Sequence, residues 1–409
     1  MSRILALDGN GAVAQAMRQI NPDVVAAYPI TPQTSIVENF AQMVADGEVA
    51  TEFITVESEH SALSACVGAS AAGGRVMTAT SSAGLAFMWE VLYIAASTRL
   101  PIVMPVVNRA LSGPINIHCD HSDTMGARDA GWVQLFSESA QEAYENTLQA
   151  VRIAEHPDVR LPVMVMQDGF ITSHGMERVE IFDDEPARKF LGEFKPHYPL
   201  LDLENPVTYG PLDFYDYYFE HKRQQVEASR HALRVVREVS DEFNRKFGRN
   251  HGILDLYRMD DAQVAVIVLS STAGTARVVV DRLRAEGLKV GLIRPRLFRP
   301  FPHEALMEVV ESLSAVAVMD RSIAFGAMRD GGPLWIETLA AAKLHNVQLP
   351  ITNYVFGLGG RDVTPAHIER VYRDLYDIVE TGRILEAVTY LGVRGDPQPK
   401  FEPEAEAVK

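Results

Sequence analysis

The chain has 409 residues, of which 47% are hydrophobic, 54 are acidic and 38 are basic, and its formal net charge is −16. This length allows two or three domains with substantial apolar cores, and the negative charge speaks against nucleic acid or an anionic membrane as a partner. The first eight residues contain one basic residue and too short an apolar run for a signal peptide, and no later run could span a bilayer, so we expect a cytoplasmic protein.

The two cysteines, Cys66 and Cys119, are far apart in the chain and lie outside any CxxC pattern. An iron–sulfur cluster or a structural zinc needs several closely spaced ligands. We therefore expect no cluster on this chain. If the reaction transfers electrons, another chain must carry them.

Short apolar runs alternate with Ala-rich stretches in the first part of the chain. Runs typical of buried parallel strands occupy residues 24–28, 75–79, 101–107 and 162–166. Helical stretches lie between them, as at residues 61–72 and 85–97. This alternation predicts an α/β fold in which helices cover both faces of a parallel sheet.

The pattern changes at about residue 182. Residues 195–218 are rich in Pro, Tyr and acidic residues, and they lead into a strongly charged helix predicted at residues 221–246. No strand signal interrupts this part of the chain. We interpret residues 182–250 as a helical interdomain arm attached to a first domain at residues 1–250.

The strand and helix alternation then returns. Apolar runs at residues 262–269, 290–293, 315–319 and 349–356, with a helix through residue 284, predict a second α/β domain over residues 251–385. The last part, residues 386–409, contains three Pro and three Glu after residue 395, and we expect it to be a mobile tail.

Three polar peptides stand among the apolar segments of the first domain: YPITP at residues 28–32, ESEH at 57–60 and VVNR at 106–109. In order and spacing they resemble the α chain of the pyruvate:ferredoxin oxidoreductases, which are 2-oxoacid oxidoreductases that use thiamine diphosphate. The resemblance continues through peptides at residues 168–170, 172–174, 299–302 and 357–362. It implies a pyrimidine-binding first domain and a second domain similar to the C-terminal domain of transketolase.

Glu59 matches the family's cofactor-activating glutamate. Thiamine diphosphate is activated when a protein carboxylate hydrogen-bonds a nitrogen of its aminopyrimidine ring. Glu59 begins a helix of small residues that could approach a cofactor closely. The alternative is that Glu57 and Glu59 are first-turn acids that stabilise the helix dipole.

Arg109 and Thr31 match the family's substrate contacts. Arg109 follows a predicted buried strand, where its guanidinium could bind the carboxylate of a 2-oxoacid with two hydrogen bonds. Thr31 lies between two prolines and could donate a hydroxyl hydrogen bond to the same carboxylate. The alternatives are a surface ion pair for Arg109 and a loop-ordering hydroxyl for Thr31.

Two His and two Asp lie close together within residues 116–123, which suggests a metal site. We interpret this stretch instead as an irregular loop, because the resemblance implies that the matching region lines the active-site mouth and a subunit contact. We expect no metal on this chain. We expect His174 to be a structural hydrogen-bonding residue.

No Gly-Asp-Gly peptide occurs in the sequence, although enzymes of this kind use one to bind the diphosphate and its Mg²⁺. The chain therefore resembles half of a thiamine site. The resemblance implies a β chain that holds the diphosphate, the Mg²⁺ and a [4Fe-4S] cluster. It also implies a γ chain and a ferredoxin-like chain with further [4Fe-4S] clusters.

The expected activity is that of the α subunit of a CoA-acylating 2-oxoacid:ferredoxin oxidoreductase, active only within a multi-subunit complex. It would convert pyruvate to acyl-CoA and CO₂, with coenzyme A as co-substrate. The mostly small residues at positions 110–114 leave an aromatic acid such as phenylglyoxylate as an alternative substrate. A non-catalytic scaffold subunit is a second alternative. A carboligase similar to acetolactate synthase is disfavoured, because it would normally carry both halves of the thiamine site.

Overall fold

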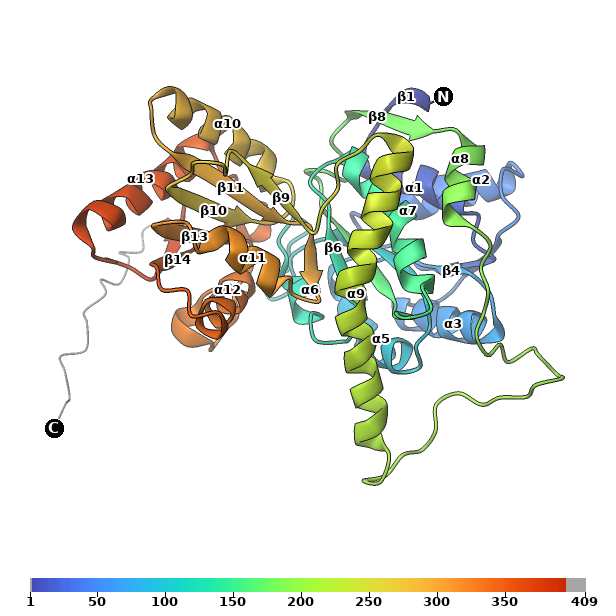
Figure 1. Ribbon diagram of the computed structural model, residues 1–409. Coiled ribbons are helices and arrows are strands. Elements are labelled where there is room, and N and C mark those ends of the chain that lie inside the picture. Colours follow the sequence, from blue (N-terminus) through green and yellow to red (C-terminus); the bar gives the residue numbers. More distant parts are fainter. Residues whose placement is uncertain (1, 395–409) are drawn as a thin grey trace. The chain divides into compact units, whose positions relative to one another are not determined.

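The computed structural model describes residues 2–394, which divide into two compact units, each with its own main sheet (Figure 1). Unit 1 runs to Ile253 and also includes Arg296–Pro302. Unit 2 consists of Leu254–Pro295 and the chain from His303 onward. From the sequence we placed residues 296–302 in the second domain. The structure assigns them to unit 1, because they contribute the edge strand of its sheet.

The main sheet of unit 1 has seven strands in the order β12-β6-β7-β5-β4-β2-β3. Every pairing is parallel except that of β12 with β6. The runs predicted as strands in the first 170 residues all contribute to this sheet, which confirms the parallel α/β fold. Its strands are β2 (Val24–Ala27), β3 (Glu52–Thr55), β4 (Val76–Met77), β5 (Val103–Asn108), β6 (Val133–Phe136), β7 (Val163–Asp168) and β12 (Leu297–Arg299).

Two of the helices of unit 1, α1 (Gly9–Ile20) and α7 (Ala140–Glu155), are almost wholly buried and pack against each other. The hydroxyl of Tyr144 donates a hydrogen bond to Gln19 Oε1 at 2.6 Å. A small antiparallel pair, which we did not predict, joins β1 (Ser2–Leu7) to β8 (Glu177–Phe182). The other helices are α2 (Thr34–Ala45), α3 (Glu59–Ala72), α4 (Ser82–Phe87), α5 (Trp89–Ser97), α6 (Ser122–Gly126), α8 (Asp184–Leu191) and α9 (Tyr218–Phe247).

The single helix predicted at residues 85–97 is divided in the structure. Met88, with φ −80° and ψ 0°, ends α4 and begins α5. The predicted charged helix is confirmed as α9. Between α8 and α9, residues 193–217 form neither helix nor strand, and Figure 1 shows them as a long connection, which we call the arm.

Arg296 explains why its segment belongs to unit 1. Its side chain is 1% exposed, and it donates hydrogen bonds to Asn146 Oδ1 on α7 at 2.7 Å and to Ser240 Oγ on α9 at 2.6 Å. A third hydrogen bond, at 2.6 Å, reaches the carbonyl of Gly252. A buried guanidinium with several acceptors fixes the segment to the two helices.

Unit 2 is a six-stranded sheet in the order β15-β14-β13-β10-β11-β9, parallel except for β9. The predicted strands of the second domain are all present. The strands are β9 (Leu254–Tyr257), β10 (Val264–Val268), β11 (Val290–Pro295), β13 (Ala315–Asp320), β14 (Ile351–Phe356) and β15 (Val388–Leu391). The helices are α10 (Thr272–Ala285), α11 (His303–Val310), α12 (Pro333–Leu344) and α13 (Pro365–Thr381), with short 3-10 turns at Met328–Asp330 and Leu358–Gly360.

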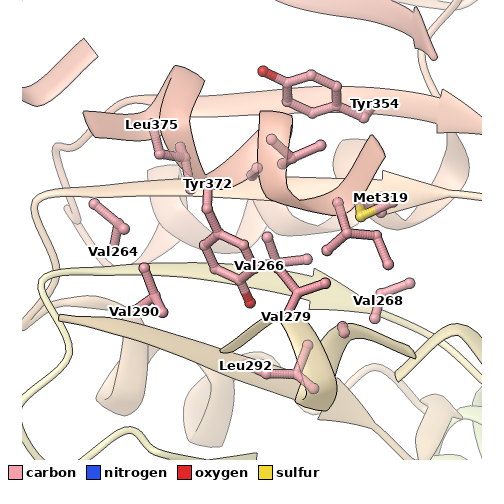
Figure 2. Packing of buried hydrophobic residues seen from close by; sticks show 14 of the residues in the cluster. Val264, Val266, Val268, Val279, Val290, Leu292, Met319, Tyr354, Tyr372 and Leu375 are labelled. Atoms are coloured by element: carbon pink, nitrogen blue, oxygen red, sulfur yellow. The ribbon is translucent and has the colours of Figure 1, made fainter. Parts of the chain in front are cut away.

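One core of unit 2 lies between the sheet and helices α10 and α13. Figure 2 shows Val264, Val266 and Val268 of β10 on the same side of the sheet as Tyr372 of α13. The Tyr372 hydroxyl donates to the carbonyl of Gly291 at 2.9 Å, so its one polar atom is satisfied inside the core.

The predicted mobile tail is partly wrong. Strand β15 lies within residues 386–409, and it pairs with β14 from Asn353↔Val388 to Phe356↔Leu391. This strand has only four residues, so its apolar pattern is too short to identify it from the sequence alone. The part of the tail at residues 395–409 lies outside the described residues.

His251 is a pH-sensitive contact in unit 1. Its Nε2 lies 2.5 Å from Glu145 Oε2, and Arg249 Nε donates to the other oxygen of Glu145 at 2.6 Å. Burial acts to lower the pKa of His251, but hydrogen bonds with Glu142 and Glu145 outweigh it and raise the pKa. Protonation of His251 is therefore favoured by folding.

A raised pKa in the folded state gives stability that is present below the unfolded pKa, about 6.5, and is lost as the pH rises through the folded value. We therefore expect His251→Gln to lower the free energy of unfolding more at about pH 6 than at about pH 9. Urea unfolding of both proteins at the two pH values measures this. A difference that does not change with pH would mean that the pKa of His251 is the same in the folded and the unfolded chain.

Candidate functional site

The residues predicted to carry chemistry lie at the carboxyl ends of neighbouring strands in unit 1. Thr31 follows β2, Glu59 follows β3 and Arg109 follows β5. Strands β5, β4, β2 and β3 are consecutive in the sheet, so their carboxyl ends meet at one edge. Open α/β sheets bind their ligands at this edge.

Glu59 is the first residue of α3. The hydroxyl of Ser58 caps this helix by accepting the backbone N–H of Ser61 at 3.2 Å. Glu59 is only 8% exposed, yet within residues 2–394 its carboxylate has no hydrogen bond and no ion pair. Buried carboxylates are normally paired, so this one is suited to a ligand that brings a donor.

Helix α4 lies against this carboxylate through Gly84. A Cβ atom at Gly84 would lie 2.7 Å from Glu59 Oε1 and 2.6 Å from Thr80 Oγ1, so any larger residue here would have to displace one of these side chains. The hydroxyls of Thr78, Thr80 and Ser81, between β4 and α4, are buried without a hydrogen-bond partner in the described structure. Of these hydroxyls, that of Thr80 lies next to Glu59, because both side chains meet Gly84.

Glu57 has a different environment, although it is only two residues away. It is exposed and accepts a hydrogen bond from the Ser61 hydroxyl, which lowers the pKa of its carboxyl group. Its carboxylate is thus exposed to water and hydrogen-bonded to a hydroxyl. The two acids thus differ in environment, and of the two only Glu59 is buried at the edge of the sheet.

Arg109 and Thr31 are in direct contact. Arg109 is 7% exposed, and its Nη1 donates to the carbonyl of Thr31 at 2.8 Å while its Nε donates to the carbonyl of Asn116 at 2.9 Å. Its Nη2 has no partner among the described residues. Since a guanidinium has five N–H groups, donors remain for a ligand carboxylate. Thr31 itself is exposed.

A third acid, Asp123, holds these elements together. One of its oxygens accepts the backbone N–H groups of Arg109 and Ser82, both at 3.0 Å. The other accepts Asn108 Nδ2 at 2.8 Å and the backbone N–H of Thr124 at 2.7 Å. Burial raises the pKa of Asp123 to about 6, and these hydrogen bonds oppose that effect. The start of α4 and the end of β5 are thus fixed to one carboxylate.

The loop over residues 116–123 brings together Cys119, His121 and Asp168, whose ligand atoms lie within 4.8 Å of one another and are all buried. His121 Nε2 lies 2.8 Å from Asp168 Oδ1, and this pairing ties the loop to the end of β7. His174 Nδ1 lies 2.8 Å from the hydroxyl of its neighbour Ser173. The contact between His121 and Asp168 thus helps to hold in place the loop that carries Asp123.

Three residues of the site were missed from the sequence. Gly84 and Thr80 lie beside Glu59, and Asp123 is one of two Asp in a stretch that the sequence predicts only as an irregular loop. The sequence signal that could have identified Gly84 and Thr80 is the stretch of mostly small residues at 80–86, which follows a predicted buried strand. Nothing in the sequence indicates that Asp123 contacts residues 41 positions earlier.

The residues around Glu59 fit the aminopyrimidine ring of thiamine diphosphate. The unpaired carboxylate can accept a hydrogen bond from a protonated ring nitrogen, and the free hydroxyl of Thr80 can contact a polar ring substituent. Gly84 lets helix α4 lie directly against this carboxylate and this hydroxyl, so both are held at one place. No Gly-Asp-Gly peptide is present for the diphosphate, so the fit concerns the ring end of the cofactor.

Two family models match the chain. The thiamine-diphosphate-binding domain of pyruvate flavodoxin/ferredoxin oxidoreductase matches residues 15–241, and core domain II of pyruvate:ferredoxin oxidoreductase matches residues 262–368. Together they cover the sheet, the arm and most of unit 2.

Similar proteins carry related names. The chain is 58% identical to pyruvate synthase subunit PorA of Thermotoga maritima over 391 residues, 95% of this chain and 98% of that protein. It is 42% identical to ketoisovalerate oxidoreductase subunit VorA of Pyrococcus abyssi over 379 residues, 92% and 95% of the two chains. A solved 2-oxoglutarate:ferredoxin oxidoreductase of Magnetococcus marinus shares the fold, with a TM-score of 0.69 and 21% identity over 91% of this chain and 65% of that one. The chain therefore belongs to the pyruvate:ferredoxin oxidoreductase family of thiamine-diphosphate enzymes.

Proposed function

We propose that the chain is the α subunit of a CoA-acylating 2-oxoacid:ferredoxin oxidoreductase that oxidatively decarboxylates pyruvate to acyl-CoA and CO₂. The observation that carries this proposal is the buried, unpaired carboxylate of Glu59. It lies at the same edge of the sheet as Arg109, a cation with free donors. A scaffold subunit would have no reason to keep either group buried and unsatisfied.

Pyruvate is favoured by the names of the relatives. The 58% identity to a pyruvate synthase subunit exceeds the 42% identity to a ketoisovalerate oxidoreductase subunit. The second name favours a branched acid as the alternative substrate. After Arg109, Ala110 is small and buried, and Leu111 is larger and exposed. The next three residues, at positions 112–114, are small and exposed. This stretch therefore leaves a phenylglyoxylate-sized acid open as a substrate as well.

When bound, thiamine diphosphate supplies a nucleophilic carbon and an electron sink for decarboxylation. Glu59 would hold its aminopyrimidine ring and keep a proton at the ring nitrogen. The first turn of α3 fixes this carboxylate, and Gly84 with α4 shields it from water. Exclusion of water strengthens the hydrogen bond that the carboxylate accepts.

Arg109 and Thr31 would orient the substrate. The contact between Arg109 and the Thr31 carbonyl fixes the guanidinium, so that its free Nη donors can bind the carboxylate of the 2-oxoacid. The exposed Thr31 hydroxyl can donate to the same group. Asp123 acts on this contact indirectly, because it fixes the backbone of Arg109. A substrate that is held in one reactive orientation reacts faster than one that is free to reorient in the site.

The remaining parts of the reaction would come from partner chains. We place the diphosphate, the Mg²⁺ and a [4Fe-4S] cluster on a β chain, and further clusters on a γ chain and a ferredoxin-like chain. Coenzyme A would take up the acyl group. None of the helices in residues 2–394 is long and apolar enough to cross a membrane. We propose a cytoplasmic complex.

The isolated chain should bind thiamine diphosphate weakly and should have no activity, because the residues for the diphosphate are on another chain. Calorimetric titration of the purified chain, compared with the assembled complex, measures this. Tight binding by the isolated chain would contradict the shared site.

Glu59→Gln in the assembled complex should lower kcat by roughly two orders of magnitude or more, since it removes an acid–base group. Glu57→Gln is the matched control: it makes the same chemical change two residues away on an exposed side chain, and it should have little effect. Equal losses in the two variants would indicate that both acids only stabilise helix α3.

Arg109→Lys should raise KM and lower kcat together, because lysine keeps the charge but loses the planar pair of donors. The expected loss of transition-state stabilisation is about 2–4 kcal/mol. Arg188→Lys, on the exposed face of α8, serves as the control. If kcat/KM is unchanged for every acid in a panel of 2-oxoacids, the substrate carboxylate is held elsewhere.

A further inference from the structure

Unit 1 has a cavity of about 640 Å³ between the arm and the body of the unit. Small-molecule sites commonly have volumes of roughly 300–1,000 Å³. Arg99 and Arg160 line it from the body, and Tyr198 and Tyr209 line it from the arm. None of the described residues that line it is acidic. The function proposed above makes no use of this cavity.

The two arginines are only partly satisfied by the protein. Arg99 donates from Nε to the carbonyl of Arg160 at 3.1 Å and from Nη2 to the carbonyl of Val159 at 2.6 Å. Its Nη1 makes no hydrogen bond to the described residues. The guanidinium of Arg160 has no hydrogen bond or ion pair within residues 2–394. Burial lowers the pKa of both side chains, and the charge of Arg160 lowers that of Arg99 further. Two partly desolvated cations thus share one cavity.

The neighbouring carboxylates do not neutralise these cations. Glu155 is bound by Arg75 through two hydrogen bonds of 2.7 and 2.9 Å. Asp158 is bound by Arg234 at 2.5 Å. Guanidinium groups in concave, partly dry sites bind oxyanions, and phosphate most readily. An anion from outside the chain would supply the missing counter-charge.

The opposite wall of the cavity is aromatic and apolar. The hydroxyl of Tyr209 donates to the backbone carbonyl of Tyr198 at 2.9 Å, which ties the ring of Tyr209 to the neighbouring segment of the arm. The lining also includes Phe194, Pro196 and Pro199. A planar ring can stack on tyrosine, so this wall suits the organic part of a ligand whose charged end lies at the arginines.

The wall is held in place by helix α3. The backbone N–H of Leu200 donates to the carbonyl of Ala71 at 2.9 Å. A Cβ atom at Gly73, where φ is +109°, would lie 2.9 Å from Pro199 Cβ, so the arm packs directly on a glycine at the end of the helix. The cavity is therefore built by defined contacts on both sides.

We propose that this cavity binds an organic phosphate, with the phosphate group at Arg99 and Arg160 and a planar ring against Tyr198 and Tyr209. The site is separate from Glu59. Ser70 of α3 lines the cavity and Glu59 begins the same helix, so at about 1.5 Å per residue they are about 16 Å apart along its axis.

Calorimetric titration of the full chain with AMP, adenosine and inorganic phosphate tests the proposal. AMP should bind more tightly than adenosine, and Arg160→Gln should weaken AMP binding roughly tenfold or more, since a charged donor pair is lost. Arg223→Gln, an exposed arginine of α9, is the matched control and should leave binding unchanged. Tyr198→Ala, a change at a side chain that is 57% exposed, should weaken binding of AMP and leave that of phosphate unchanged.

Failure of AMP to saturate the chain, or equal binding of AMP and adenosine, would overturn the proposal. Equal binding of AMP and inorganic phosphate would overturn its aromatic half. If Arg160→Gln does not fold, Arg160→Lys keeps the charge and should bind AMP more weakly than the unaltered chain does; equal affinity would count against the proposal. The readout is binding, so the result does not depend on the proposed enzyme activity.

Discussion

The buried carboxylate of Asp123 is the contact on which the geometry of the candidate site depends. A carboxylate away from water is stable only where several donors surround it, and four converge on Asp123. Two of them are backbone N–H groups, of Ser82 and Arg109, so the carboxylate joins the start of α4 to the end of β5. The position of Gly84 against Glu59 follows from the position of α4.

Unit 1 contains buried charges of two kinds. Arg296 is surrounded by acceptors on α7 and α9, and His251 is bound to an acid of α7. These groups stabilise the fold. Glu59 and Arg109 are buried to a similar degree, but the described residues leave the carboxylate of Glu59 and the Nη2 of Arg109 without partners. Unsatisfied polar groups cost stability, and proteins keep them where a ligand completes the hydrogen bonds.

Much of the fold could be predicted from the sequence, because alternating apolar runs specify buried strands through local pattern alone. Two features depended on distant contacts. Residues 296–302 return to unit 1 through the side chain of Arg296, and β15 is recognisable only beside β14. The same holds at the site. Glu57 and Glu59 are alike in sequence apart from the family resemblance, whereas the contact of Gly84 with Glu59 distinguishes them at once.

We propose that Glu59 receives the aminopyrimidine ring of thiamine diphosphate beside Gly84. A cryo-electron microscopy structure of the assembled complex with thiamine diphosphate bound measures this directly. We expect the carboxylate of Glu59 to lie roughly 2.6–3.2 Å from a nitrogen of the pyrimidine ring. A ring nitrogen more than about 5 Å from Glu59, beyond the reach of a hydrogen bond, or bound by a carboxylate of another chain, would contradict it.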